Sequence, residues 1–316
     1  MRRLGCCRGS AGAPKGAPEA APAPAGKLFF RGVELPRGAR PADLSALHEF
    51  FAAASDATTD DLPRIIRFLR ARKNNLPDAL ALWRQDQEWR AREHIDEIMT
   101  EHVDSAVERA IAGHYAPMML DEYSHDGRLV MYRQLGELDM DKLSKQQGIE
   151  MKHLTRRHVR EMERLRRKMD SDTIGAGALA GHLSILDLKG TSLLKFLSAR
   201  SFWQVIGGLD GTHYAETLGA LVIINPPPLT QYALNTVKAF IDPVTASKIT
   251  VRNGPPSSFL HEYVAVHVLP DHLRPAPSAD GSSVGRAPEA RAAAPVSAVP
   301  VIVAPAAPKT RSGRAK

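Results

Sequence analysis

The stretch TLGALVIINPPPLTQYALNTVKAFIDPVTASKI (217–249) combines an apolar strand, a proline turn and two helices. Residues 218–224 are apolar and rich in branched side chains, which is typical of a strand buried on both faces. The prolines at 226–228 end that strand. Apolar residues then recur at helical spacing beside polar ones, so an amphipathic helix is predicted over 230–241. This order of elements favours a lipid-sized pocket with a lid over a catalytic centre.

A second helix is predicted over 243–249, with Asp242 as its N-cap and Pro243 at its first position. Thr245 and Lys248 are three residues apart and therefore lie on the same side of this helix. A hydroxyl and an ammonium group placed there can hold a phosphate-bearing head group.

The rest of the chain alternates between strands and helices. This alternation implies an α/β fold with a mainly parallel sheet and crossover helices. Strands are predicted near 129–134, 182–188 and 219–225, and helices near 43–53, 60–73, 76–92, 104–112, 150–168, 192–206 and 213–218.

Both ends of the chain are of low complexity. Residues 1–26 are rich in Ala, Pro and Gly, and residues 275–316 are rich in Ala, Pro and Arg. Neither end can bury enough apolar surface to offset its conformational entropy, so both are predicted to be disordered. No run of eighteen apolar residues occurs, and no transmembrane helix is predicted.

The two cysteines, Cys6 and Cys7, both lie in the N-terminal tail. No disulfide framework supports the fold, and a reducing compartment is expected. Because arginines flank the pair, palmitoylation or an organelle transit peptide are alternatives to an inert tail, which we favour.

The net charge of +7 is partly carried by KHLTRRHVREMERLRRK (152–168). Glutamates are interleaved with these arginines, Leu154, Met162 and Leu165 form a core-facing stripe, and aromatic residues for base stacking are missing. A helix packed on the sheet is therefore favoured over a nucleic-acid contact, with attraction to an anionic membrane as the alternative.

Enzyme motifs are missing from the sequence. GxSxG, HExxH and GxxxxGK[ST] do not occur, and the twelve histidines lack metal-ligand spacing. His182, Ser184 and Asp187 invite a triad interpretation, but side chains along one strand cannot converge as a triad requires. We expect no catalytic residue, no metal and no cofactor.

Four stretches resemble the CRAL-TRIO lipid-binding family, and most closely its phosphatidylinositol/phosphatidylcholine transfer proteins. The resemblance covers about residues 43–272 and implies a small N-terminal helical module followed by a mainly parallel β-sheet with crossover helices that enclose a lipid pocket. The four stretches are the segment quoted above, IIRFLRARKNNLPDALALWRQDQEWR (65–90), DGRLVMYRQLGELD (126–139) and SILDLKG (184–190).

We therefore expect a mostly disordered tail at 1–42, the CRAL-TRIO helical module at 43–103, the lipid-binding domain at 104–272 and a disordered Ala/Pro/Arg-rich tail at 273–316. The family usually continues LPxxLGG, whereas this chain reads LPDHLRPAPS, so the domain is expected to end early.

The resemblance also implies the residues that bind the lipid head group. The phosphatidylinositol-binding pattern of the family falls on Arg72, Lys73, Glu216, Asp242, Thr245 and Lys248. The phosphatidylcholine-binding pattern of the family is matched only in part by this sequence. Ser184 supplies one hydroxyl, but His182 stands at the other hydroxyl position and Met131 stands at a tyrosine position. We expect phosphatidylinositol and a second ligand other than, or weaker than, phosphatidylcholine.

A cavity for the lipid chains is predicted between the sheet and the 230–241 helix. Its floor would consist of Leu183, Ile185, Leu186, Val222 and Ile224, and its lid would carry Tyr232, Val237, Phe240 and Ile241. Each of these residues fits an ordinary core position equally well.

The expected function is phospholipid binding and transfer between membranes, or presentation of the lipid to lipid kinases, by a protein that is not an enzyme. The expected partners are phosphatidylinositol and a transient membrane surface, without nucleic acid. A carrier of another small hydrophobic ligand, such as a tocopherol- or retinoid-like molecule, is the alternative. We expect a cytoplasmic protein that acts peripherally on Golgi or other endomembranes, with organelle targeting by the basic N-terminus as the alternative.

Overall fold

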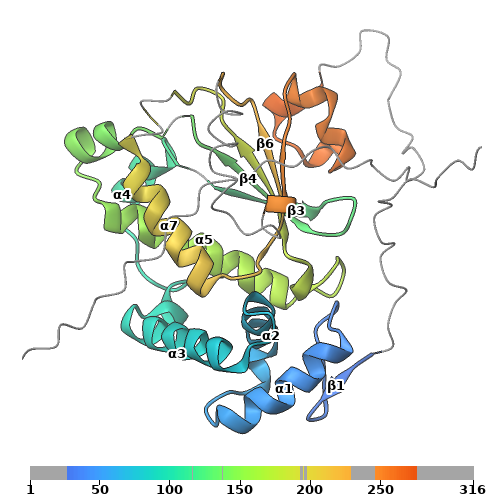
Figure 1. Cartoon of the computed structure of the whole chain (residues 1–316). Helices are drawn as coiled ribbons and strands as arrows, with labels where there is room; N and C mark the ends of the chain where they lie inside the picture. Colours follow the sequence, from blue (N-terminus) through green and yellow to red (C-terminus); the bar gives the residue numbers. More distant parts are fainter. Residues whose placement is uncertain are drawn as a thin grey trace, which may run out of the picture.

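A five-stranded sheet forms the centre of the computed structural model, which describes residues 27–115, 117–136, 138–192, 195, 198–228 and 246–275 (Figure 1). The strand order is β3-β4-β5-β6-β7; β3 pairs with β4 antiparallel, and the remaining pairs are parallel. The strands are β3 (Met118–Tyr123), β4 (Leu129–Gln134), β5 (His182–Asp187), β6 (Leu218–Ile224) and β7 (Ile249–Val251).

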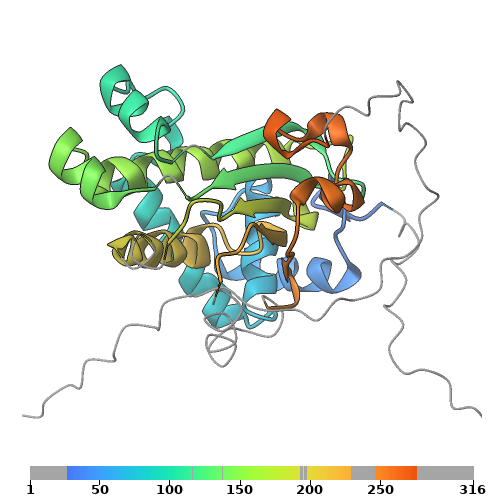
Figure 2. The same ribbon diagram turned by 90° about the horizontal axis from the view of Figure 1, so that it is seen from above.

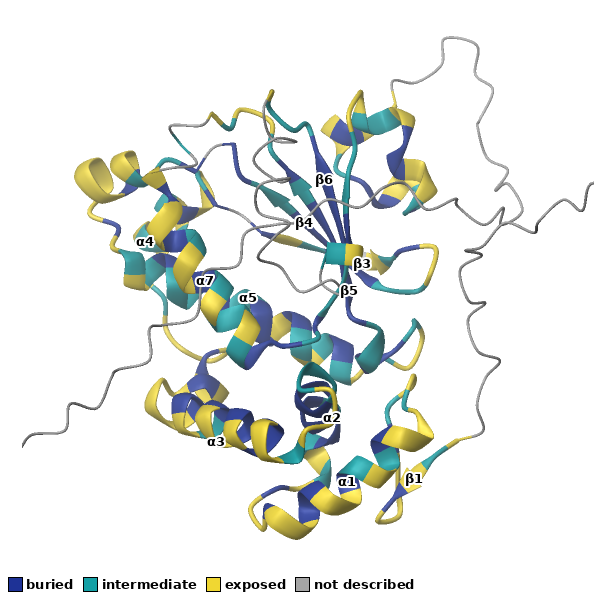
Figure 3. Cartoon of the chain, viewed as in Figure 1, coloured by how far each residue is buried: buried dark blue, intermediate teal, exposed yellow. Residues whose placement is uncertain are grey.

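A helical module precedes the sheet. It contains the hairpin β1 (Phe29–Phe30) and β2 (Val33–Glu34), and the helices α1 (Pro41–Ala53), α2 (Leu62–Ala71) and α3 (Leu76–Arg92). Proline lies within the first two positions of each helix, where its missing N–H costs nothing. The buried sides of the three helices face one another (Figure 3). Their core includes the predicted apolar stripe of α2 and the ring of Trp83, which meets Phe50 edge-on.

The two faces of the sheet are covered by different parts of the chain. The helices α4 (Ser105–Ala112), α5 (Met151–Asp170) and α7 (Arg200–His213) pack on one side. Short 3₁₀ turns between residues 256 and 273 pack on the other. Seen from above, α7 and these turns lie on opposite sides of the strands (Figure 2).

Buried ion pairs attach the module to α5. Arg90 of α3 donates to both oxygens of Glu163, at 2.8 and 3.2 Å. Arg67 of α2 pairs with Asp170 at the end of α5. Ala215, which follows α7, packs into the core of the module. The module is therefore joined to the sheet by both polar and apolar contacts.

Most predicted elements are found, with three differences. Within the helix predicted near 192–206, Lys195 and Ser198 are helical, and a turn at Ala199 precedes α7, which begins at Arg200. The helix predicted near 213–218 is a turn, because α7 continues to His213. Of the helix predicted over 243–249, the last residue, Ile249, begins β7, whose three β-branched residues favour a strand and pair with β6. The predicted lid, 230–241, lies outside the described residues.

The edge strand β3 and the β1–β2 hairpin were not predicted from the sequence. The edge strand β3 reads MMLDEY, whose two acidic residues break the apolar pattern, and the β1–β2 hairpin has only two residues in each strand. Among the helices in the described part of the chain, none is long and apolar enough to cross a bilayer.

Candidate functional site

One face of the sheet carries polar side chains among its apolar ones. This inner face, covered by α5 and α7, includes Met131 and Arg133 of β4 and His182, Ser184 and Leu186 of β5. Met131 pairs with Ser184, and Arg133 pairs with Leu186, so these side chains form neighbouring rows. His182 and Ser184 are both only 2% exposed.

Four of the apolar residues predicted for the pocket floor lie on the opposite face. They pack against the C-terminal turns, where Phe259, Leu260 and Val264 are buried with them. The sheet separates them from Ser184, because successive side chains of a strand point to opposite faces. Leu186 shares the inner face with Ser184. That the other four contact a lipid stays a prediction, and their packing is that of ordinary core residues: Leu183, Ile185, Val222 and Ile224.

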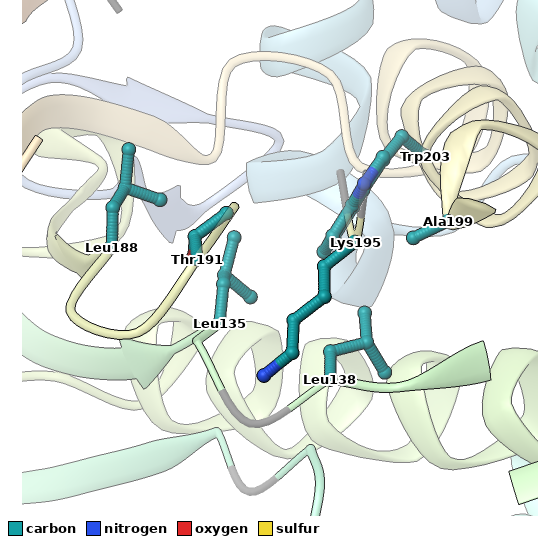
Figure 4. A pocket seen from close by; sticks show the side chains of 7 residues that line it. All are labelled: Leu135, Leu138, Leu188, Thr191, Lys195, Ala199 and Trp203. Atoms are coloured by element: carbon teal, nitrogen blue, oxygen red, sulfur yellow. The ribbon is translucent and has the colours of Figure 1, made fainter. Parts of the chain in front are cut away.

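A small apolar cavity lies at the carboxyl ends of β4 and β5 (Figure 4). Ligands of open α/β sheets commonly bind at this end of the strands. Lys195 lines the cavity and donates from Nζ to the carbonyl oxygen of Gly136 at 2.9 Å, which leaves its methylene chain facing the apolar wall. The lining residues are Leu135, Leu138, Leu188, Thr191, Lys195, Ala199 and Trp203.

Two of the predicted head-group residues lie together in the structure. Nζ of Lys248 is 3.0 Å from Oε2 of Glu216, and the two side chains are 20% and 34% exposed. The backbone of Glu216 is left-handed, with φ of 58°, at the turn that leads into β6. The carbonyl oxygen of Lys248 accepts from the N–H of Leu221 at 2.7 Å, so the sheet fixes the position of the lysine.

Arg72 and Lys73 lie where α2 ends. Lys73 has a left-handed backbone, with φ of 53°, and the next N–H, of Asn74, closes the helix end on the carbonyl of Leu69 at 2.7 Å. With the described residues, neither cationic side chain forms a hydrogen bond or an ion pair. Asp242 and Thr245 lie outside the described residues.

The module connects these two groups of residues. Ala215, the neighbour of Glu216, packs in the same apolar cluster as Leu69 near the end of α2. The structure therefore places the Glu216–Lys248 pair beside the module that carries Arg72 and Lys73.

Arg133 was not predicted as a site residue. The two polar contacts of its guanidinium within the described chain are to thioether sulfurs, 3.1 Å to Met131 and 3.3 Å to Met162. The nearby carboxylate of Asp210 is hydrogen-bonded to His158 at 2.8 Å and does not pair with Arg133. Alternation along β4 was the available signal, because it places Arg133 on the same face as Met131.

His182 is held as a neutral imidazole. Its Nδ1 donates to the carbonyl oxygen of Thr217 at 2.8 Å, and its Nε2 is buried without a partner. Burial, together with the charge of Arg133, lowers the pKa of His182 to about 4. Among the described residues, the inner face therefore presents one cation without an ion-pair partner and one acceptor without a donor.

The CRAL/TRIO domain family matches residues 114–273, and the chain belongs to that family. It is similar to phosphatidylinositol/phosphatidylcholine transfer protein SFH9 of Arabidopsis thaliana, with 31% identity over 217 residues, which cover 68% of this chain and 37% of that protein. It is also similar to the Sec14 cytosolic factor of Schizosaccharomyces pombe, with 29% identity over 210 residues, which cover 66% of this chain and 72% of that protein.

Among solved structures, the crystal structure of Sfh5 shares the fold, with a TM-score of 0.51 and 15% identity over 65% of this chain and 68% of that one. The α/β fold and the family resemblance inferred from sequence are thus confirmed. The match with SFH9 spans little more than a third of that relative, so the domain limits and site residues remain predictions.

Proposed function

We propose that this protein binds phosphatidylinositol and transfers it between membranes, without acting as an enzyme. The observation that carries the proposal is the Glu216–Lys248 pair, which adjoins Ala215 in the core of the helical module. The same module carries Arg72 and Lys73, two cations without described partners, at the end of α2. The names of SFH9 and its relatives as phosphatidylinositol/phosphatidylcholine transfer proteins support the same ligand class.

The chemistry of such a site follows from the charges. A phosphodiester takes charge-assisted hydrogen bonds from ammonium and guanidinium groups. The carboxylate of Glu216 accepts hydrogen bonds from inositol hydroxyls and keeps Lys248 oriented when no lipid is bound. A tocopherol- or retinoid-like ligand has no phosphate that these cations would serve.

Extraction of a lipid also needs a place for its chains. A diacyl lipid carries roughly thirty methylenes, each worth about 0.8 kcal/mol on burial, so transfer from a bilayer to water costs on the order of 25 kcal/mol. The cavity between Leu135, Leu188 and Trp203 supplies apolar wall at one end of the inner face. We place the chains along this face, toward that cavity.

The test is mass spectrometry of lipid extracted from protein purified out of a eukaryotic host. The variant Lys73→Ala/Lys248→Ala should lose phosphatidylinositol, whereas the wild type should carry about one molecule per chain, the stoichiometry of a single enclosed pocket. The matched control is Lys145→Ala/Lys152→Ala, which removes the same charge from side chains that are 76% and 68% exposed.

Equal loading of both double variants would place the head group elsewhere. A bound hydrophobe without phosphate would favour the alternative carrier function. The same loaded protein would serve transfer or presentation to a lipid kinase at the cytoplasmic side of Golgi or other endomembranes. Vesicle exchange of labelled phosphatidylinositol separates the two, because presentation alone needs little bulk transfer.

A further inference from the structure

The inner face of the sheet holds a cation, Arg133, that forms no ion pair with any described residue. Arg133 has five N–H donors, and its described polar contacts are two thioether sulfurs, which are weak acceptors. Its Nε lies 3.1 Å from Sδ of Met131, and Met131 is the strand partner of Ser184. The guanidinium of Arg133 therefore lies beside Met131, in the row of side chains that also contains Ser184. The two strands of this row, β4 and β5, are about 5 Å apart.

Two further groups on this face, in His182 and Ser184, have no hydrogen-bond partner among the described residues. Nε2 of His182 is buried and has no hydrogen bond, although its Nδ1 is used by Thr217. With Nδ1 as the donor and the ring neutral, Nε2 is an acceptor that needs an O–H or N–H. Ser184, two residues further along β5, is 2% exposed, and its hydroxyl has no hydrogen bond within the described chain.

A buried polar group without a partner costs free energy, so such a group in a native structure calls for an explanation. We propose that Arg133, His182 and Ser184 form a site for the acidic group of an anionic amphiphile, a carboxylate or a phosphate, in preference to phosphatidylcholine. The inference rests on the proposed function, because it names the second ligand class of the same lipid-binding domain.

The charges on this face explain the preference. An acidic group accepts from the guanidinium of Arg133 and from the hydroxyl of Ser184, and a P–OH or C–OH proton can be donated to Nε2 of His182. The trimethylammonium group of choline offers no N–H or O–H donor and is repelled by Arg133. The phosphodiester of phosphatidylcholine can reach Arg133, but it has no O–H for Nε2 of His182, and the choline cation beside it offsets the attraction to the guanidinium.

The test uses the full chain and vesicles that contain equal amounts of phosphatidylcholine, phosphatidic acid and oleate. After separation from the vesicles, lipids bound to the protein are quantified by mass spectrometry. The wild type should retain acidic lipid over phosphatidylcholine by about tenfold or more, the ratio that 1.4 kcal/mol produces. Enrichment of phosphatidic acid would identify a phosphate site, and enrichment of oleate a carboxylate site.

Arg133→Gln should lower this ratio about tenfold, because it keeps hydrogen-bond donors but removes the charge, and Arg133→Lys should restore most of it. Arg164→Gln is the matched control, because Arg164 is an exposed arginine of α5. An unchanged ratio in Arg133→Gln, or a wild type that prefers phosphatidylcholine, would overturn the inference.

A parallel sample with phosphatidylinositol vesicles separates this inference from the proposed function. If phosphatidylinositol is loaded but acidic lipids are not enriched, the inner-face site is wrong and the proposed function stands. If no phospholipid of any kind is loaded, both are wrong.

Discussion

Glu163 is the residue on which the buried contact between the helical module and α5 depends. Its side chain is completely buried. It accepts hydrogen bonds from Arg90 of α3 at 2.8 and 3.2 Å and from Arg166 at 2.9 Å. Replacing it by glutamine keeps the shape but leaves Arg90 with the carboxylate of Asp96, which is 80% exposed. We expect Glu163→Gln to lower the free energy of unfolding strongly.

The magnitude follows from the pKa of this carboxyl. Burial alone would raise the pKa of Glu163, but the hydrogen bonds and charges of Arg90 and Arg166 lower it from 4.5 to about 2. This difference corresponds to roughly 3 kcal/mol in favour of the folded, ionised protein. It agrees with the 3–5 kcal/mol that loss of one partner from a buried ion pair typically costs.

The assay is urea unfolding of wild type and Glu163→Gln, with Glu88→Gln, an exposed carboxylate on α3, as the control. Because the folded pKa lies below the unfolded one, the stabilisation is complete above pH 4.5 and is lost as the pH falls toward 2. The difference between wild type and variant should therefore be largest near pH 7 and shrink below pH 4.5. A loss below about 1 kcal/mol at pH 7 would refute the reasoning, since exposed pairs already reach that value.

Two other substitutions test local features of β5. In the wild type, stability should fall by up to about 3 kcal/mol as the pH decreases from 6.5 to 4, because the unfolded imidazole binds a proton before the folded one, whose pKa is about 4. His182→Gln should remove this pH dependence. An equal difference between the urea midpoints of wild type and variant at pH 7 and at pH 4.5 would contradict this. Gly181→Ala should lower the melting temperature, because φ is +72° and a Cβ would lie 2.5 Å from the backbone nitrogen of Gly219. Gly207→Ala in α7, where a Cβ meets open space, should instead be neutral or stabilising by about 0.5–1 kcal/mol, and equal melting temperatures for both would argue against the close approach.

The central strands of this fold can be predicted from the sequence. The strand β6 is an apolar run, whereas β4 and β5 combine apolar with polar residues; all three were predicted within one or two residues. By contrast, β7 has only the three β-branched residues Ile249–Val251, a signal too short to define a strand without its pairing to β6. Short strands and edge strands are set by neighbours that lie far away in the chain.

The inner-face site shows a second limit of prediction from the sequence, namely which face of a strand meets which helices. Alternation along a strand separates its side chains into two sets, but it does not tell which set faces which neighbouring element. Alternation places Ser184 opposite Leu183 and Ile185, but which face meets α5 and α7 depends on packing. Arg133 could have been assigned to the face of Met131, yet its lack of an ion pair is visible only in the structure.

The prediction of the head-group residues rested on family motifs rather than on hydrophobic periodicity or spacing. Glu216 and Lys248 are 32 positions apart, and their contact arises because β6 pairs with the strand that directly follows Lys248. Arg72 and Lys73 alone would suit any helix C-terminus, where cations interact favourably with the helix dipole.

The attachment of the module to the sheet links stability to ligand binding. Arg72 and Lys73 lie at the end of α2, whereas Glu216 and Lys248 are held by β6 and its neighbours. A phosphate bound by both groups would bridge the module and the sheet, in parallel with the buried pair between α3 and α5. The energy of that pair keeps the two halves of the proposed site in register before a ligand arrives, which reduces the ordering cost of binding. In the proposed site, the exposed Lys73 and the partly buried Lys248 would be aligned by a contact that lies in the core.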